Sequence, residues 1–422
     1  MNRENSNGFT SIASFFLAVY YIWYALPFMK ITFRAEVFKY LFFSCFAVGI
    51  CFLCIARILH QKMRFLISVR VTSLTPVIIY MVVLSVLCLF HIADATNHIR
   101  VSFTFWGTLI VYQLFAFDRN AQVHFGRFLL ILFLLTSLTS LTAVVSDSSA
   151  ARAIANASQR PEAIARDYEL MKKNVSGVYL FQCLTIFSPV PVLMLCRKKK
   201  VLLGSALLCI IILAILKASF TISLFVLVVA CVTAAAFNYR TITKLFLPVC
   251  GMIILFLPMD TLFFLLSNII ENQYIRARIL EIALFFQEHS VQGDLQLRLQ
   301  CYLYSLRTFI VNPLGVGPWY SYHIGEHGIG YHSAMIDDVA RYGVFALAFY
   351  GMFLKKYYQL LQEQWRKIGF ESAVFPMLLA WVLFLLLNIG FRSADESIFM
   401  LYILPVLPDA LRSRALERER SV

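Results

Sequence analysis

Long apolar runs separated by short polar segments repeat along almost the whole chain. They lie near residues 10–29, 37–56, 74–91, 101–117, 128–146, 175–195, 201–216, 220–238, 245–268, 338–354, 373–391 and 397–408. A bilayer span needs about 20 mostly apolar residues, and only helices or closed barrels satisfy the backbone in lipid. Continuous runs lack the alternating pattern of a membrane barrel. The pattern therefore predicts an all-α polytopic membrane protein with about 12 transmembrane helices.

The amino-acid composition separates this chain from soluble globular proteins. Of its 422 residues, 60% are hydrophobic and 14% are charged, whereas soluble chains have about 45–50% apolar and about 25% charged residues. A soluble fold of this size could not bury so much apolar surface, so part of the solvent must be lipid. The first apolar run is not followed by an Ala-x-Ala cleavage site, so we expect it to remain as a span.

Basic residues between the runs assign the connecting segments to the two faces of the membrane. A cytoplasmic N-terminus places on the same side the segments 60–70, 118–127, 197–200, 239–244, 355–372 and 412–422. With Arg3 and Arg57, these segments contain 21 of the 37 Lys and Arg residues, as expected of cytoplasmic loops. The C-terminus is then also cytoplasmic. The net charge of +14 is scattered among spans, so membrane lipids rather than nucleic acid are the expected partners.

The spans divide the chain into three predicted regions. Residues 1–267 contain nine spans and a smaller outer loop near 146–176. Residues 268–337 form the largest segment outside the membrane, and residues 338–422 contain the last three spans and a basic tail. The large loop is the natural place for a site that works outside the lipid.

The large outer loop is rich in Arg, although the positive-inside rule would deplete Arg there. Helical patterns at 270–289 and 294–310 precede a Gly- and His-rich stretch at 312–331, which is expected to be a loop. The Arg residues of this region are Arg276, Arg278, Arg298, Arg307 and, just past its end, Arg341. The planar fork of Arg suits phosphate.

Two alternatives compete with an anion site. The arginines could instead pair with the neighbouring acids, which are Glu271, Glu281, Glu288, Asp294, Glu326, Asp337 and Asp338. A second outward cation, Lys217, lies in a very short turn between two spans, and a Lys at a membrane surface often only extends its amine to water.

Three histidines lie within ten residues near the end of the loop, at His323, His327 and His332. The first two match the H-x-x-E-H pattern of some zinc proteases. That chemistry needs both His on one face of a helix, and Gly325 and Gly328 disfavour a helix there. We therefore set a zinc hydrolase aside and expect no metal and no other cofactor.

A second pattern in this loop resembles the signature of the O-antigen ligase and polymerase superfamily, which includes the Wzy-type repeat-unit polymerases. His332 and Ser333 are followed by nine residues and then Gly343, where the superfamily has His, then Asn, Ser or Gln, then nine residues and a Gly. Upstream, Arg298 opens a helical segment that ends in a Pro-Leu-Gly-Val-Gly turn at 313–317. Ten to fourteen spans with one dominant late periplasmic loop are also typical of that superfamily.

The chain departs from the superfamily pattern at two positions. Phe220 follows Ser219 where an Arg is often found, so Lys217 would have to supply that charge. After Gly343, Ala346 stands where a second Gly is usual.

The resemblance implies transfer of a glycan from an undecaprenyl-diphosphate carrier to an acceptor hydroxyl, at the periplasmic face of a bacterial inner membrane. His332 would be the general base, since an imidazole with an ordinary pKa of about 6.5 suits that role. Asp337 or Asp338 would orient it, and Arg298 would stabilise the diphosphate leaving group. Further candidates for substrate binding are Arg276, Arg278, Arg307, Arg341, Lys217, His323 and His327.

Three functions remain open at this point. A polymerase joins lipid-linked repeat units into O-antigen, capsule or exopolysaccharide, and the paired acids after His332 favour this interpretation. A ligase moves a finished glycan onto lipid A core or protein. A polysaccharide transporter is the third, although charges within the spans are few and no inverted repeat is visible. Expected partners are the lipid-linked glycan donor, the glycan acceptor, and a chain-length regulator and flippase of the same pathway.

Overall fold

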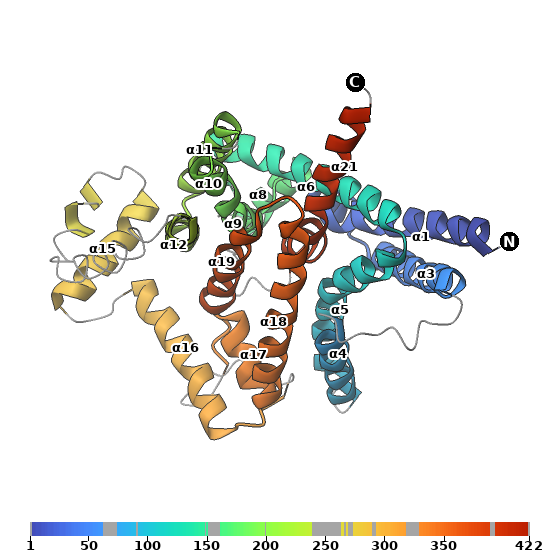
Figure 1. Ribbon diagram of the computed structural model, residues 1–422. Coiled ribbons are helices and arrows are strands. Elements are labelled where there is room, and N and C mark those ends of the chain that lie inside the picture. Colours follow the sequence, from blue (N-terminus) through green and yellow to red (C-terminus); the bar gives the residue numbers. More distant parts are fainter. Residues whose placement is uncertain are drawn as a thin grey trace. The chain divides into compact units, whose positions relative to one another are not determined.

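In the computed structural model of the chain, all regular secondary structure in the described residues is helical, and no strand is found among them. The described residues are 2–61, 74–89, 92–147, 149–150, 161–198, 200–238, 263–265, 267–268, 273–288, 293–317, 329–388 and 393–420. Most of the predicted span at 245–268 and the histidines His323 and His327 lie outside these ranges. The helical fold class predicted from the sequence is confirmed (Figure 1).

Several helices are long and apolar enough to cross a membrane. In the described part of the chain these are Asn7–Ala25, Glu36–His60, Arg119–Ser146, Val178–Cys196 and Val201–Ala218. Shorter apolar helices cover Ser102–Phe117, Thr221–Phe237 and Glu371–Leu387. The chain therefore has the helices of a multi-pass membrane protein.

Large apolar side chains cover the outer surface of these helices. On the helix that spans Arg119–Ser146, Ile131 is 65% exposed and Leu138 is 62% exposed. Leu202 and Leu213 are exposed in the same way on the helix Val201–Ala218. Contiguous apolar surface of this extent is not stable in water, but lipid tails solvate it without cost.

The contacts divide the chain into two compact units. Unit 1 comprises residues 1–183, 349–371 and 392–422, and unit 2 comprises residues 184–348 and 372–391. Unit 1 contains α1 (Asn2–Ala25), α2 (Pro27–Thr32), α3 (Glu36–Gln61), α4 (Leu74–Leu89), α5 (Ile92–Leu114), η1 (Phe115–Phe117), α6 (Arg119–Ser146), α8 (Pro161–Lys172), α20 (Ala394–Ile398), the π-helix η3 (Phe399–Ile403) and α21 (Leu404–Arg420). Unit 2 contains α10 (Pro189–Cys196), α11 (Val201–Ala218), α12 (Thr221–Asn238), α15 (Gln273–Glu288), α16 (Gly293–Val311), α17 (Ala334–Tyr342) and α19 (Val374–Leu387). Helices α9 (Val178–Phe187), α18 (Val344–Arg366) and η2 (Glu371–Ala373) cross the divisions.

Proline residues shape the end of the chain in unit 1. Pro405 and Pro408 have no N–H, so each leaves a carbonyl one turn earlier without its helical donor. The phenol of Tyr357 donates to the carbonyl of Met400, and Trp365 Nε1 donates to the carbonyl of Leu404 at 3.1 Å. Because these side chains supply donors to the two carbonyls, the helix continues past both prolines. The predicted short span at 397–408 is part of a longer helical stretch from Ala394 to Arg420.

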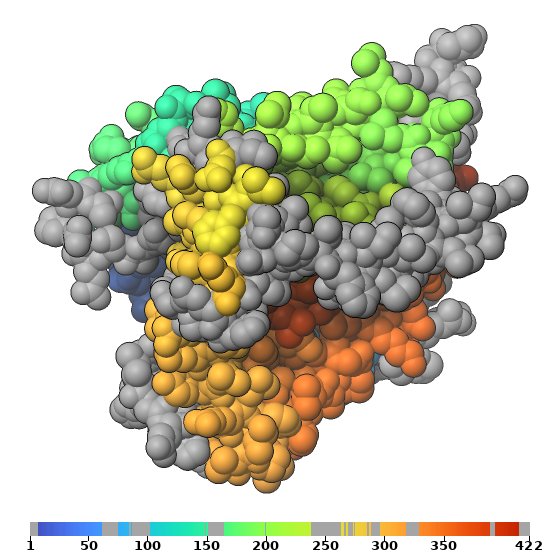
Figure 2. Space-filling model, turned by 90° about the vertical axis from the view of Figure 1, so that its left-hand side faces the viewer, coloured from blue at the N-terminus to red at the C-terminus, as the bar shows by residue number. Residues whose placement is uncertain are grey.

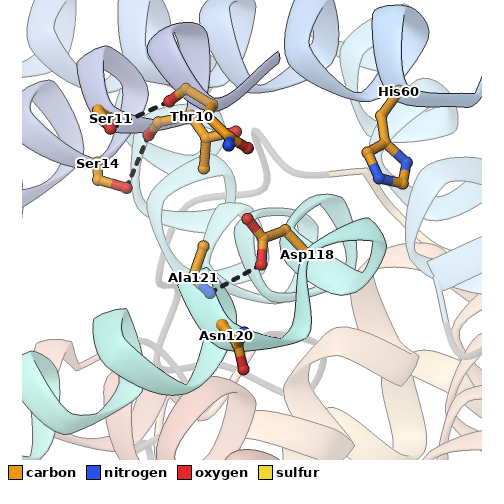
Figure 3. A pocket seen from close by; sticks show the side chains of 8 residues that line it. Thr10, Ser11, Ser14, His60, Asp118, Asn120 and Ala121 are labelled. Atoms are coloured by element: carbon orange, nitrogen blue, oxygen red, sulfur yellow. Dashed lines mark hydrogen bonds between the residues drawn. The ribbon is translucent and has the colours of Figure 1, made fainter. Parts of the chain in front are cut away.

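Segments that the sequence assigns to the cytoplasmic face lie together within unit 1. Asp409 pairs with Arg119 and lies 3.1 Å from Lys367 Nζ. Arg119 also donates to Gln364 at 2.8 Å. A polar pocket is lined by His60, Asp118, Asn120 and Ala121 from these segments and by Asn7, Thr10, Ser11 and Ser14 from α1 (Figure 3). The start of α1, the end of α3 and the start of α6 therefore face one hollow.

Segments that the sequence assigns to the outer face form a separate group in the same unit. Ser176 donates a hydrogen bond to Asp395. Arg34 lies over the ring of Tyr168, with its guanidinium carbon 5.4 Å from the ring centroid. These contacts join the predicted outer connections 30–36, 146–176 and 392–396 to one another.

Some predicted boundaries were wrong. The span expected at 338–354 is two helices, because α17 ends at Tyr342 and Gly343 adopts a φ of 59° before α18 begins. Helix α18 then continues to Arg366, so most of the segment 355–372, expected as a connection, is helical. The predicted span at 175–195, by contrast, corresponds to the apolar helical stretch Val178–Cys196, which has a turn at Ser188 where Pro189 and Pro191 follow.

Candidate functional site

The candidate site in unit 2 is built on one face of α16. Cys301, Ser305 and Thr308 are buried at four- and three-residue spacing along this face. This face packs against α17, which in turn contacts α19. Figure 1 and Figure 2 both show α16 and the segment that contains α17 side by side.

The Pro-Leu-Gly-Val-Gly turn at 313–317 binds directly to the C-terminal end of α17. Gly317 N–H donates to the Arg341 carbonyl at 2.8 Å, and Val316 N–H donates to the Ala340 carbonyl at 3.2 Å. In return, Val344 N–H donates to the Pro313 carbonyl at 2.9 Å. The two sequence patterns noted above are therefore parts of one structure.

Two glycines allow this close approach of backbone to backbone. Gly315 has a φ of 87° and Gly343 a φ of 59°, which other residues rarely adopt. A Cβ on Gly315 would overlap the carbonyl of Arg341, and a Cβ on Gly343 would overlap the carbonyl of Pro313. Each glycine is therefore required by the backbone that faces it.

Asp337 is the buried acid at the centre of the site, with 3% of its surface exposed. Ser305 Oγ donates to its Oδ1 at 2.6 Å, and the Ser333 N–H donates to its Oδ2 at 3.2 Å. Burial raises the pKa of Asp337 above its ordinary value of 3.8, although Ser305 and Arg341 favour the charged form. The burial of this acid therefore carries a desolvation cost, which the hydrogen bonds from Ser305 and Ser333 partly offset.

This pKa has a testable consequence for stability. A carboxyl whose folded pKa is raised destabilises the fold at high pH, and that penalty disappears as pH falls through the folded pKa. We therefore expect the difference in melting temperature between the wild type and Asp337→Asn to shift in favour of the wild type as pH is lowered from 8 towards 4. Thermal melts of the purified proteins in detergent would measure it, and a difference independent of pH would contradict the assignment.

Asp338, the acid that follows Asp337 in the chain, forms an ion pair. Asp338 Oδ1 lies 3.5 Å from Nη1 of Arg341, and both side chains are buried. The guanidinium carbon of Arg341 lies 5.0 Å from the ring centroid of Tyr331, a cation–π distance. Tyr331 has a φ of 55°, so its backbone is held in a conformation that non-glycine residues rarely adopt.

His332 lies between two fixed neighbours. Tyr331 precedes it, and Ser333 follows it as the N-cap of α17, accepting the Ile336 N–H at 3.1 Å. Ser333 Oγ also donates to the Leu385 carbonyl in α19 at 3.2 Å. The His332 side chain is partly exposed, so the imidazole is held on a defined backbone and remains within reach of solvent.

Arg298 is connected to this network through Tyr302. Its guanidinium hydrogen-bonds to the Tyr302 phenol, and the charge of Asp337 acts on the same phenol. The Tyr302 O–H donates to the Leu387 carbonyl at 2.9 Å. Arg298 and Asp337 therefore both act on the Tyr302 phenol, and Arg298 is half-buried on the helix face described above.

The remaining predicted binding residues are placed elsewhere or are not described. Arg278 pairs with Glu281 on α15 at 2.7 Å, so the pairing alternative holds for that residue. Arg276, Arg307 and Lys217 are exposed on α15, α16 and α11. His323 and His327 lie outside the described residues.

The sequence did not identify Tyr302, Ser305 or Gly330 as parts of the site. Gly330 N–H donates to Ser305 Oγ at 2.8 Å. The available signal was helical spacing, because Arg298, Tyr302 and Ser305 share one face of a helix. Two acids in unit 1 were also missed. Asp395 and Glu396 are buried on the helix α20, although the sequence places them between two apolar runs.

Asp395 has a polar environment of its own in unit 1. Burial raises its pKa, while the hydrogen bond from Ser176 and the charge of Lys30 act in the opposite direction. The outer group of segments in unit 1 is therefore organised around a buried acid.

Comparison with known proteins finds no matching family model and no matching curated relative. Any functional conclusion therefore rests on the residues and the geometry given above.

Proposed function

We propose that this protein is a polymerase that joins undecaprenyl-diphosphate-linked repeat units at the periplasmic face of a bacterial inner membrane. One observation carries the proposal. The turn at 313–317 and the end of the His332–Gly343 pattern hydrogen-bond to each other, and the helix with Arg298 is bonded to the same segment through Ser305 and Asp337. Residues from three separate stretches of the resemblance thus meet at one place.

The chemistry assigns a role to each group. His332 takes the proton from the acceptor hydroxyl, and the acceptor oxygen forms a bond to the anomeric carbon of the donor. The bond between that carbon and the diphosphate oxygen breaks, and its electron pair leaves with the lipid diphosphate. Arg298 stabilises the charge that develops on this leaving group, so the reaction requires no metal cofactor.

The proposed topology has 12 spans with both termini in the cytoplasm. The two groups of segments in unit 1 support it, because in the described residues connections assigned to the same face contact each other. The same assignment puts residues 268–337 in the periplasm, where lipid-linked repeat units are presented. The partners are then the lipid-linked donor, the growing glycan acceptor and membrane lipids.

A ligase and a transporter are the alternative proposals, and glycan profiling of a deletion strain separates them. A ladder that collapses to a single repeat unit on its acceptor supports the polymerase. Full-length polymer that accumulates on the lipid carrier indicates a ligase instead. A ladder unchanged by the deletion overturns both enzyme assignments and favours transport.

Replacing Arg298 with Lys is expected to reduce polymer synthesis by about tenfold or more, because a point charge does not reproduce a bidentate fork. Rates of repeat-unit transfer in membranes with matched protein levels would measure the effect. Arg366→Lys is the matched control, since Arg366 is exposed at the end of α18 and outside the site. Wild-type chain length in the Arg298→Lys strain would show that Arg298 has only a structural role.

A further inference from the structure

We propose that Ser305 is a positioning residue that fixes the His332 segment on the helix that carries Arg298. This inference deepens the proposed function and rests on it. Ser305 is completely buried. Its hydroxyl makes two hydrogen bonds at once, accepting the Gly330 N–H at 2.8 Å and donating to Asp337 Oδ1 at 2.6 Å.

These bonds anchor both ends of the segment that contains His332. Gly330, two residues before it, is bonded to Ser305. Ser333, directly after it, is bonded to Asp337, and Asp337 is itself bonded to Ser305. One hydroxyl therefore organises the backbone on either side of the proposed general base.

The segment also lies in direct contact with α16. A Cβ on Gly330 would overlap the backbone of Cys301, so the chain is seated on the helix at that point without an intervening side chain. Cys301 follows Arg298 by three residues, which is about one helical turn. The contact between Gly330 and Cys301 therefore sets the distance between His332 and Arg298. The hydrogen bonds of Ser305 maintain this contact.

The chemistry of position 305 requires a group that both donates and accepts. A serine hydroxyl has one donor and two acceptor sites, and both functions are used here. Alanine would leave the Gly330 N–H and one carboxylate oxygen of Asp337 without this partner in a buried place. The segment would then be free to move away from α16, and His332 would move with it.

The test compares Ser305→Ala, Ser305→Thr and the control Ser223→Ala in purified full-length protein, using a synthetic lipid-diphosphate-linked repeat unit as donor. Ser223 is a buried serine on α12, outside the site. Rates are expressed per folded protein at a low temperature, with the folded fraction taken from gel filtration and a thermal melt. We expect kcat of Ser305→Ala to fall about 10- to 100-fold while KM for the donor changes less than about threefold. Ser305→Thr, which keeps a hydroxyl, should lie much closer to the wild type, and Ser223→Ala should have the wild-type kcat.

Three outcomes would overturn the proposal: a wild-type kcat in Ser305→Ala, a fall in rate that only tracks the loss of folded protein, or equal losses in Ser305→Ala and Ser305→Thr. These outcomes are distinct from failure of the proposed function. That failure would appear as no glycan transfer by the wild-type protein, or as full transfer by His332→Ala. An inactive His332→Ala beside a fully active Ser305→Ala would reject the role of Ser305 alone.

Discussion

Replacing His332 with Ala is expected to abolish polymer formation while the protein remains in the membrane at its normal level. A positioned general base contributes about 10²–10⁴-fold to a rate, and a ladder on a gel disappears well within that range. The folded structure should persist, because the His332 side chain is partly exposed. The backbone on either side of it is held by the hydrogen bonds of Gly330 and Ser333.

Glycan profiles of a deletion strain complemented with each variant would test this expectation, with membrane levels measured by immunoblot. His124→Ala is a suitable control, because His124 is also solvent-exposed but lies on α6 in unit 1. A normal ladder from His332→Ala would remove the proposed base, and with it the polymerase mechanism described here. Loss of the ladder in both variants would point to a general effect on the membrane protein.

The geometry separates the roles of two acids that the sequence left equivalent. Asp337 receives hydrogen bonds from Ser305 and Ser333, so it organises the backbone beside His332. Asp338 instead pairs with Arg341, whose guanidinium faces Tyr331. Asp337 therefore holds the backbone that follows His332. Asp338 pairs with Arg341, and the cation–π contact of Arg341 is with Tyr331, the residue that precedes His332.

The helical class of the fold could be predicted because it follows from solvent physics. Apolar runs as long as a bilayer is thick must be helical, whatever their neighbours are. The interruption at Gly343 could not be predicted in the same way, since it arises from the approach of the backbone at Pro313 from another part of the chain. The hydropathy of residues 338–354 does not indicate that the backbone at Pro313 packs against Gly343.

The buried hydrogen bonds of the site were hidden for a related reason. Ser305 is an ordinary small residue in the sequence, and its role depends on which carbonyl, N–H and carboxylate tertiary packing brings to it. The glycines at 315 and 343 were visible as parts of a pattern, but the reason for them is visible only in their mutual contact. Spacing along a helix can indicate a face, whereas only the folded chain shows what that face touches.

Replacing Gly343 with Ala is expected to disrupt the site. Position 343 has a φ of 59° and a ψ of −140°, a backbone region that costs a non-glycine residue about 1–3 kcal/mol, and here the new Cβ would also overlap the Pro313 carbonyl. The turn at 313–317 must then move away from the end of α17, which breaks the hydrogen bonds from Val316, Gly317 and Val344. We expect a loss of at least about 2 kcal/mol in local stability and loss of polymer formation.

Gly351→Ala provides the matched control, because it adds the same methyl group to α18 eight residues further on. A Cβ at Gly351 meets nothing within 4 Å, and Ala in a helix interior is more stable than Gly by about 0.5–1 kcal/mol. Thermal melts and limited proteolysis should therefore show Gly343→Ala cleaved faster near 313–317 and Gly351→Ala unchanged or slightly stabilised. Equal behaviour of the two variants would mean that the turn does not depend on Gly343. The packing of the two sequence patterns on each other, which carries the proposed function, would then lose its main physical support.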